Sequence, residues 1–212
     1  MHMQQHLRYK LQNGAIEMKK EVFIDISARH VHLSDKDREA LFGEGYTLTK
    51  KKMLGPTNYS TEEQIAVTSE KSTFSKVRMI EPARKRTQVE ISRTDARTLG
   101  MNPPVRLSGD LDGTPGIKLT GPAGEVEIEE GVIVVKRHLH LGPNFAEKYG
   151  IKNGDNVWVR VDSDGRRLIF GDVEARVSKE DSDKVLMHID TDEANAAGMP
   201  GPMWGYIVDI DD

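Results

Sequence analysis

The sequence predicts a mainly β fold with short helices, arranged as two small β-barrel subdomains that are related by an internal repeat. From residue 21 the chain reads as short, alternating, β-branched segments separated by turns, and its helical segments span only one or two turns. This pattern favours small barrels over a parallel sheet. The pentapeptide RHVHL at residues 29–33 also returns as RHLHL at residues 137–141. A repeat of this size indicates two similar subdomains about a pseudo-twofold axis.

Alternating apolar residues mark three strand-rich segments. EVFIDISARHVHL (21–33) predicts a strand that ends in the first His pair. In 154–177, alternating valines are followed by an Asp-Gly turn at 164–165 and a second alternating run, which predicts a β-hairpin. EVEIEEGVIVVKRHLHL (125–141) predicts another strand pair, with a turn near 130–131.

Two short helices can be placed by their end signals. Ser34 is positioned to cap a helix that ends at Gly43, with Asp37 as the reciprocal partner of the cap. Pro143 suits the first turn of a helix that ends at Gly150.

Composition bounds the class of protein. The 212 residues are 37% hydrophobic and 30% charged, with a net charge of −4, which argues against a nucleic-acid binder. No apolar run approaches the ~20 residues that span a bilayer, and the N-terminus lacks the apolar core of a secretory signal. We therefore expect a cytoplasmic protein with no membrane or nucleic-acid partner. Because the chain has no cysteine, histidine, aspartate or glutamate must hold any metal.

Residues 1–20 form a predicted N-terminal tail. Leu7 and Leu11 are spaced for one helical face, but Gly14 soon interrupts the pattern. A tail and a short docking helix both stay open, and the tail is favoured.

The repeat extends beyond the pentapeptides. VEISRTDARTLGM (89–101) follows the first His pair and MHIDTDEANAAGM (187–199) follows the second. Each begins as a strand with one potential ligand and continues through Thr-Asp and a short helix to Gly-Met. Alignment of the two strands places Glu90 opposite His188.

This pattern predicts two metal sites. Residues i and i+2 of a strand point to the same side, so each His pair can converge on one ion. A single His-x-His is more often a pair of surface histidines, and the repeat is what favours metal binding. Three protein ligands with one open position is the catalytic form of zinc, while iron, cobalt and nickel fit less specifically. The two predicted ligand sets are His30, His32 and Glu90, and His138, His140 and His188.

A basic cluster precedes one of these ligands. EPARKRTQVE (81–90) contains Arg84, Lys85 and Arg86, and guanidinium groups match phosphate oxygens in pairs. Alone it would be a solvated basic turn, but next to Glu90 it is a candidate anion clamp. The Gly-rich segment 106–116 lacks any established phosphate-loop pattern.

Four strings show a family resemblance. The chain resembles the PduL-type phosphotransacylases, also called phosphate propanoyltransferases, from about residue 21 to the C-terminus. These strings are SARHVHLSDKDREALFGEGYTLT (27–49), EPARKRTQVEISRTDARTLGMNPPVRLSGDL (81–111), GVIVVKRHLHLGP (131–143) and HIDTDEANAAGM (188–199).

The resemblance implies transfer of a short acyl group, propanoyl or acetyl, between coenzyme A and inorganic phosphate at a site with two zinc ions. It implies two small β-barrels capped by short helices. It also implies a homodimer, with a second copy of the chain as partner. Residues 21–28 with 136–212 would form the first barrel and 29–135 the second. Family members in bacterial microcompartments carry an amphipathic N-terminal helix, and the weakly amphipathic tail here leaves both a microcompartment and the free cytoplasm open.

Site residues also follow from the resemblance. It implies that the two ligand sets hold zinc and that Arg84, in the string PAR..TQVE, is the essential phosphate-positioning arginine. The implied coenzyme A contacts are Ser27, Lys52, Arg78 and Asn195. The segment MLGPTNYSTEEQIAV (53–67) departs from the family pattern, which bears on local loop structure and substrate fit.

The sequence is consistent with three functions. The first is direct attack of phosphate on the thioester, with zinc stabilising the departing thiolate and Arg84 holding the phosphate. The second is a dinuclear zinc hydrolase of a thioester or phosphoester. The third is a non-catalytic, metal-stabilised binding module, which would fill all four zinc positions.

Overall fold

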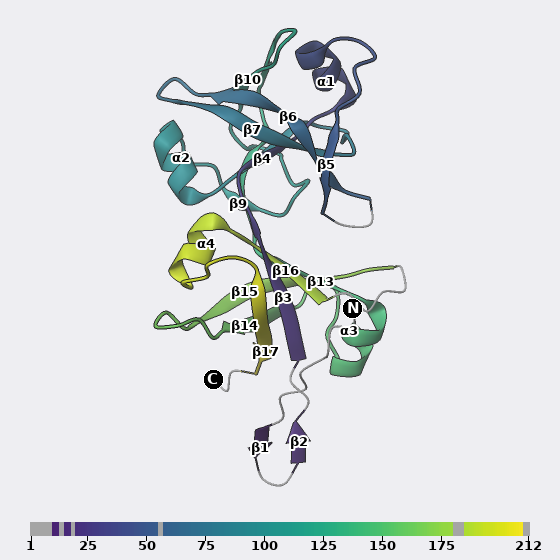
Figure 1. Cartoon of the computed structure of the whole chain (residues 1–212), viewed down its shortest axis with the longest axis vertical. Coiled ribbons are helices and arrows are strands. Elements are labelled where there is room, and N and C mark those ends of the chain that lie inside the picture. Colours follow the sequence, from purple (N-terminus) through teal and green to yellow (C-terminus); the bar gives the residue numbers. More distant parts are fainter. Residues whose placement is uncertain (1–9, 13–14, 18–19, 55–56, 180–184, 210–212) are drawn as a thin grey trace. The chain divides into compact units, whose positions relative to one another are not determined.

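The structure is a computed structural model that describes residues 10–12, 15–17, 20–54, 57–179 and 185–209 (Figure 1). These residues form mainly β-strands with four short helices, which confirms the predicted fold class. The chain divides into two compact units. One comprises the described residues of Met1–Ile26, Arg137–Ile189 and Glu193–Asp212, and the other comprises those of Ser27–Lys136 and Asp190–Asp192.

The first unit is built on a closed six-stranded barrel with the order β13-β15-β14-β17-β3-β16. Its strands are β3 (Lys20–Ser27), β13 (His138–Leu141), β14 (Asn156–Val161), β15 (Leu168–Val177), β16 (Val185–Asp190) and β17 (Met203–Val208). Side chains that alternate inward fill the barrel, among them the fully buried Val22, Ile24 and Leu139. The predicted hairpin is confirmed, because β14 and β15 pair antiparallel around a turn in which Gly165 has a φ of 74°.

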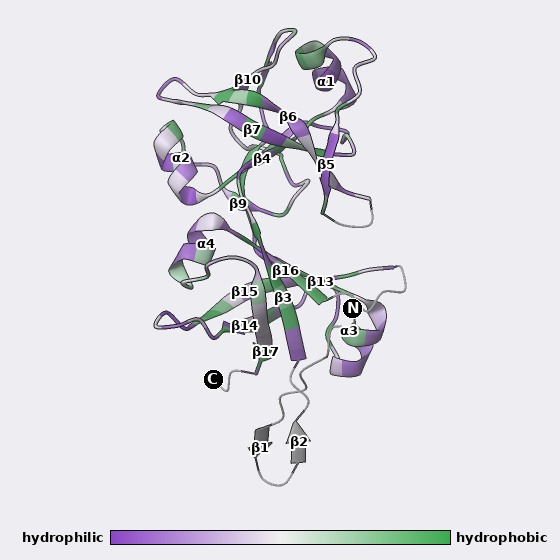
Figure 2. Cartoon of the chain, in the orientation of Figure 1, coloured by the Kyte–Doolittle hydropathy of each residue, from purple (hydrophilic) through white to green (hydrophobic). Residues whose placement is uncertain are grey.

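The second unit is built on a nine-stranded sheet with the order β11-β10-β6-β7-β4-β8-β12-β9, with β5 paired to β6. Its strands are β4 (His30–His32), β5 (Lys50–Met53), β6 (Tyr59–Thr68), β7 (Thr73–Glu81), β8 (Gln88–Ile91), β9 (Val105–Arg106), β10 (Ile117–Thr120), β11 (Glu125–Ile128) and β12 (Val132–Val135). This sheet curls as a half-barrel around its own apolar core, which includes Val31, Val89 and Val132. In Figure 2 the hydrophobic colour is concentrated along strands, and the helices are mixed or hydrophilic.

Two strand predictions require correction. The segment 21–33 is not one strand, because β3 ends at Ser27 and β4 starts at His30 in the other sheet. The predicted pairing within 125–141 is wrong as well. β11 pairs with β10, while β12 lies between β8 and β9 and is parallel to both. The reason is burial, because the wholly apolar β12 fits a central position, whereas β11 alternates between half-exposed and exposed residues at the edge.

Four short helices follow ligand-bearing strands. They are α1 (Asp35–Phe42), α2 (Arg93–Leu99), α3 (Pro143–Tyr149) and α4 (Thr191–Ala196). The predicted ends of α1 and α3 are confirmed, because Ser34 caps α1, Pro143 starts α3, and Gly43 and Gly150 end them.

The reciprocal bond predicted for Asp37 is not formed. The Ser34 side chain accepts the backbone N–H of Asp37 at 3.1 Å, but the Asp37 carboxylate accepts the Thr87 hydroxyl. The Ser34 N–H donates to the same Thr87 oxygen at 2.9 Å. Thr87 therefore stands between the two partners of the expected capping box, since a hydroxyl can accept one bond and donate another.

Within the N-terminal tail, β1 (Lys10–Gln12) and β2 (Ala15–Glu17) form an antiparallel ribbon. A docking helix is therefore not formed over these six residues, and Leu7 and Gly14 lie outside the described residues. Among the helices of the described residues, none has the length and apolar character needed to cross a bilayer.

The internal repeat is visible in the strand order. β4 lies between a parallel neighbour, β7, and an antiparallel neighbour, β8. β13 likewise lies between the parallel β15 and the antiparallel β16. Each His-x-His strand therefore occupies the same kind of position in its own unit.

Candidate metal centre and anion site

The first ligand set is assembled by strand register. In the antiparallel pair β4 and β8, His30 lies directly opposite Glu90. His30, His32 and Glu90 are all buried, with 8%, 5% and 6% of their surface exposed. One ligand atom from each lies within 4.8 Å of the others. The register thus brings together residues that are far apart in the sequence.

The distances fit a tetrahedral metal. His30 Nε2 lies 3.2 Å from Glu90 Oε2, and His32 Nε2 lies 3.6 Å from Glu90 Oε1. Ligand atoms at the usual zinc distances of ~2.0–2.2 Å are roughly 3.3 Å apart at tetrahedral angles. Two imidazoles and one carboxylate are also a donor set that suits zinc. The donors therefore match such an ion in chemistry and in spacing.

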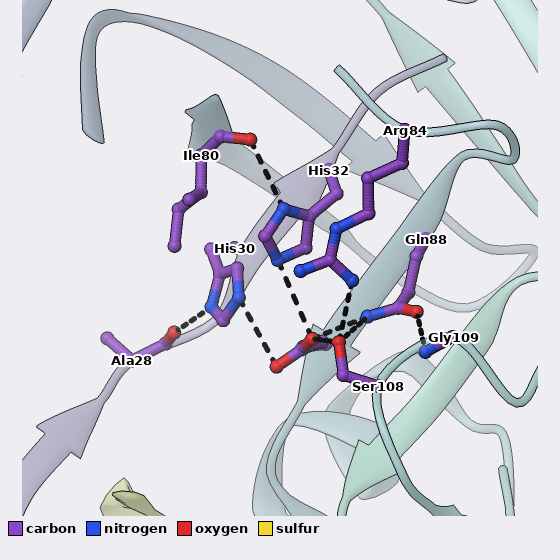
Figure 3. Close-up of polar contacts among 9 residues, drawn as sticks. Ala28, His30, His32, Ile80, Arg84, Gln88, Ser108 and Gly109 are labelled. Atoms are coloured by element: carbon purple, nitrogen blue, oxygen red, sulfur yellow. Dashed lines mark hydrogen bonds and ion pairs between the residues drawn. The ribbon is translucent and has the colours of Figure 1, made fainter. Parts of the chain in front are cut away.

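Backbone carbonyl groups orient both imidazoles. His30 Nδ1 lies 2.9 Å from the Ala28 carbonyl oxygen, and His32 Nδ1 lies 3.2 Å from that of Ile80 (Figure 3). Because a carbonyl oxygen only accepts, each Nδ1 carries the proton and the lone pair of each neutral ring is on Nε2. Metal-binding histidines are held in this way.

Burial and charge set the pKa values of this trio. Burial alone would raise the pKa of Glu90, but the charges and hydrogen bonds of His30 and His32 hold it well below its usual range. Burial lowers the pKa of His32 to about 4, with the charge of His30 adding to the effect. Burial also opposes protonation of His30, but the Glu90 carboxylate outweighs it and raises the pKa of His30. Glu90 is therefore a carboxylate ready to bind a cation.

Arg84 lies beside this trio. Figure 3 shows its side chain next to His32, with the guanidinium turned toward Ser108. Arg84 Nη1 donates a hydrogen bond to Ser108 Oγ at 2.6 Å. Its positive charge also opposes protonation of His30 and His32, as the smallest of the effects on each ring. The structure therefore brings the predicted anion-binding side chain to the predicted metal ligands.

Sequence reasoning missed two residues of this site, Gln88 and Ser108. Gln88 Nε2 donates to the Glu90 carboxylate and, at 2.9 Å, to Ser108 Oγ. Gln88 is two residues before Glu90 on β8, and this same-face spacing was a signal that could have identified it. Ser108 lies in the Gly-rich segment 106–116, whose pattern did not mark this serine as a site residue.

The second ligand set lies in the barrel unit. His138 on β13 lies directly opposite His188 on β16. The three ring centroids are 4.9 Å apart for His138 and His140, 5.3 Å for His138 and His188, and 5.4 Å for His140 and His188. Glu90 and His188, which correspond in the sequence alignment of the two halves, therefore occupy equivalent register positions in the two units.

A similar arginine–carboxylate pair lies beside each set. Arg29, before the first His pair, forms an ion pair with Asp95 of α2, and its guanidinium lies 4.2 Å from the Phe74 ring centroid. Arg137, before the second pair, bonds Glu193 of α4 at 2.7 Å. Each arginine thus connects a His strand to the helix that follows the third ligand. The sequence showed both arginines but not their partners.

The residues predicted to contact coenzyme A lie in several places. Ser27 borders a small cavity of about 10 Å³ that His30 and Glu90 also line. Arg78 on β7 lies beside His30 in register, and its Nη1 donates to the Thr61 carbonyl at 2.8 Å. Lys52 is exposed on β5.

The fourth predicted contact, Asn195, is exposed on α4 in the barrel unit. An open hollow of about 600 Å³ lies elsewhere on the half-barrel unit, between the start of α1, residues 85–87 and residues 128–130. Its lining includes Lys85 and Arg86 of the basic cluster but no predicted metal ligand.

Comparison with known proteins identifies the family of this chain. A family model described as phosphate propanoyltransferase matches residues 23–200. The chain belongs to the phosphate propanoyltransferase family. It is 50% identical over 190 residues to a phosphate propanoyltransferase of Thermotoga maritima, which covers 89% of this chain and 90% of that protein.

Two further relatives with the same name extend the likeness. The chain is 46% identical over 184 residues to a protein of Clostridioides difficile, covering 85% of this chain and 87% of the relative. It is 48% identical over 179 residues to one of Salmonella arizonae, covering 84% of each. Membership of the phosphate propanoyltransferase family confirms the stated resemblance and the prediction of an acyltransferase. The roles of the metal ligands, Arg84 and the coenzyme A contacts stay predictions.

Proposed function

We propose that this protein transfers a propanoyl group between coenzyme A and inorganic phosphate: propanoyl-CoA and phosphate give propanoyl phosphate and CoA. A C–O bond forms, the thioester C–S bond breaks, and the proton lost by phosphate leaves with the thiol. The observation that carries the proposal is the buried His30, His32 and Glu90 set with Arg84 beside it. A metal ligand set next to an arginine suits a reaction in which an anion is the nucleophile.

In this proposal each ligand set holds one zinc ion, His30, His32 and Glu90 in one unit and His138, His140 and His188 in the other. Bound zinc supplies a Lewis acid that polarises an oxygen and has good affinity for a thiolate. The backbone contacts to Ala28 and Ile80 keep both Nε2 lone pairs directed at the ion position.

Arg84 binds inorganic phosphate and directs one of its oxygens at the thioester carbonyl. A guanidinium presents a planar fork of donors, which matches two phosphate oxygens at once. Holding the anion in place lowers the entropic cost of bringing two substrates together. The proposed coenzyme A contacts are Ser27, Lys52, Arg78 and Asn195. The phosphates of coenzyme A suit the cationic side chains of Lys52 and Arg78.

Thiol release from propanoyl-CoA, followed with and without phosphate, tests the proposal. We expect release only when phosphate is present, with propanoyl phosphate formed in equal amount and detected by phosphorus NMR. Sulfate at the same ionic strength is the control and should not replace phosphate. Release without phosphate would instead identify a thioester hydrolase, and no release in either case would identify a binding module.

A further inference from the structure

The Ser108 hydroxyl lies between β9 and β10 and contacts three side chains from residues 84–90, those of Arg84, Gln88 and Glu90. It accepts a hydrogen bond from Arg84 Nη1 at 2.6 Å and one from Gln88 Nε2 at 2.9 Å. It donates to Glu90 Oε1 at 2.9 Å. Figure 3 shows Arg84 and Gln88 converging on this one oxygen. Ser108 therefore connects the predicted anion-binding arginine to the predicted metal-binding carboxylate.

The direction of each bond is fixed by chemistry. The guanidinium of Arg84 can only donate, and a carboxylate can only accept. The Gln88 amide is oriented by the Gly109 N–H, which donates to Gln88 Oε1 at 2.7 Å and so turns Nε2 toward Ser108. A hydroxyl has one proton and two lone pairs, so all of the bonding capacity of Ser108 is used.

The backbone around Ser108 is built to present this hydroxyl. Leu107 O accepts the N–H of Asp110 at 3.0 Å, which closes a turn with Ser108 and Gly109 in its centre. Gly109 has a φ of 99°, in the left-handed region, and a Cβ there would meet nothing within 4 Å. The glycine is therefore required for the turn conformation and not for space.

We propose that Ser108 is a positioning residue that holds the guanidinium of Arg84 ready to bind inorganic phosphate, with Gln88 and Gly109 fixing the hydroxyl in turn. The inference rests on the proposed function, because it assigns the phosphate to Arg84. A free arginine side chain loses rotamer freedom when it binds an anion, and holding it beforehand reduces that cost. The guanidinium has five N–H groups, so a bond to Ser108 is compatible with a bidentate bond to phosphate.

The test compares Ser108→Ala, Ser108→Thr and the unchanged protein, all loaded with zinc. We expect Ser108→Ala to raise the KM for phosphate about tenfold, as for loss of a hydrogen bond to a charged group, while the KM for propanoyl-CoA changes less than about twofold. Ser108→Thr keeps a hydroxyl and should restore most of the phosphate affinity. Ser75→Ala, at an exposed serine of β7, is the matched control and should change neither KM.

Two measurements without turnover separate this inference from the proposed function. Calorimetric titration with inorganic phosphate should show the same weakening in Ser108→Ala, and zinc content should equal that of the unchanged protein. If the unchanged protein released thiol without phosphate, the proposed function would fail while the titration still decided the role of Ser108. Unaltered phosphate binding in Ser108→Ala, loss of zinc from it, or no phosphate binding by the unchanged protein would each overturn the inference.

Discussion

The two His-x-His strands have the same kinds of neighbouring strand, but the third residue of their predicted ligand sets differs. In each unit the strand has a parallel neighbour on one side and an antiparallel neighbour on the other, and the third ligand lies opposite the first histidine. An arginine before each His pair reaches the helix after the third ligand. The half-barrel unit, however, supplies the carboxylate of Glu90, and the barrel unit supplies the imidazole of His188.

This difference shows that backbone register can be duplicated while the chemistry at a register position changes. A carboxylate cancels one charge of a divalent ion, whereas three neutral imidazoles cancel none. Glu90 also accepts hydrogen bonds from Gln88 and Ser108, which connect it to Arg84. The half-barrel unit therefore combines the predicted anion-binding arginine with predicted metal ligands, and the internal repeat accounts only for the latter.

The largest effect is expected from Arg84→Ala. Without the guanidinium, turnover should fall by about 100-fold or more, as for removal of one electrostatic catalytic group, and zinc content should stay unchanged. Steady-state kinetics and elemental analysis give the two values. Arg86→Ala is the matched control, because Arg86 pairs with Asp112 and Glu130 at the surface. Near-normal turnover in Arg84→Ala would remove this residue from the mechanism.

The independence of the two ligand sets is tested by removing one ligand from each. His32→Ala and His140→Ala should each lose one of the two predicted zinc ions and keep the other, because each set is completed by strands of its own unit. Metal content after gel filtration gives the stoichiometry. If either single variant lost both ions, the two sets would not be separate sites.

Acidification should weaken zinc binding at the Glu90 set. Zinc needs neutral imidazoles, and Glu90 raises the pKa of His30 above its ordinary value of about 6.5. As pH falls through that raised pKa, the metal-free site gains a proton on His30, which must be lost before zinc binds. Zinc affinity should therefore decrease below a midpoint above pH ~6.5. Zinc affinity is measured in His140→Ala, in which only the Glu90 set is expected to bind zinc. A midpoint well below pH 6 would contradict the prediction.

The smallest effects are expected at the two repeat arginines. Arg29→Ala should lower the free energy of unfolding by about 1–2 kcal/mol, because it removes a bond to a buried carboxylate and a contact with an aromatic ring. Asp95 has 5% of its side chain exposed and Glu193 has 20%, so Arg137→Ala should cost less. Urea unfolding of both variants gives the order, with the exposed Arg97→Ala as control. Equal or reversed losses would show that carboxylate burial does not set the difference.

Local patterns allowed much of the fold to be predicted, and they identified the residues that strand register brings together as the two predicted ligand sets. The β14–β15 hairpin follows from alternation and an Asp-Gly turn, and the ends of α1 and α3 follow from Ser34, Pro143 and the glycines after them. The correspondence of Glu90 and His188 follows from the repeat, since equal sequence spacing produced equivalent strand registers.

The sequence by itself therefore determined which residues could bind metal, because strand periodicity and an internal repeat are properties of neighbouring residues. Tertiary structure decided the placement of β12 between β8 and β9, since a short apolar run does not specify its partners. It alone also joined Ser108 to Arg84, Gln88 and Glu90. Contacts between distant segments depend on how the whole sheet buries its apolar faces, and no local pattern contains that information.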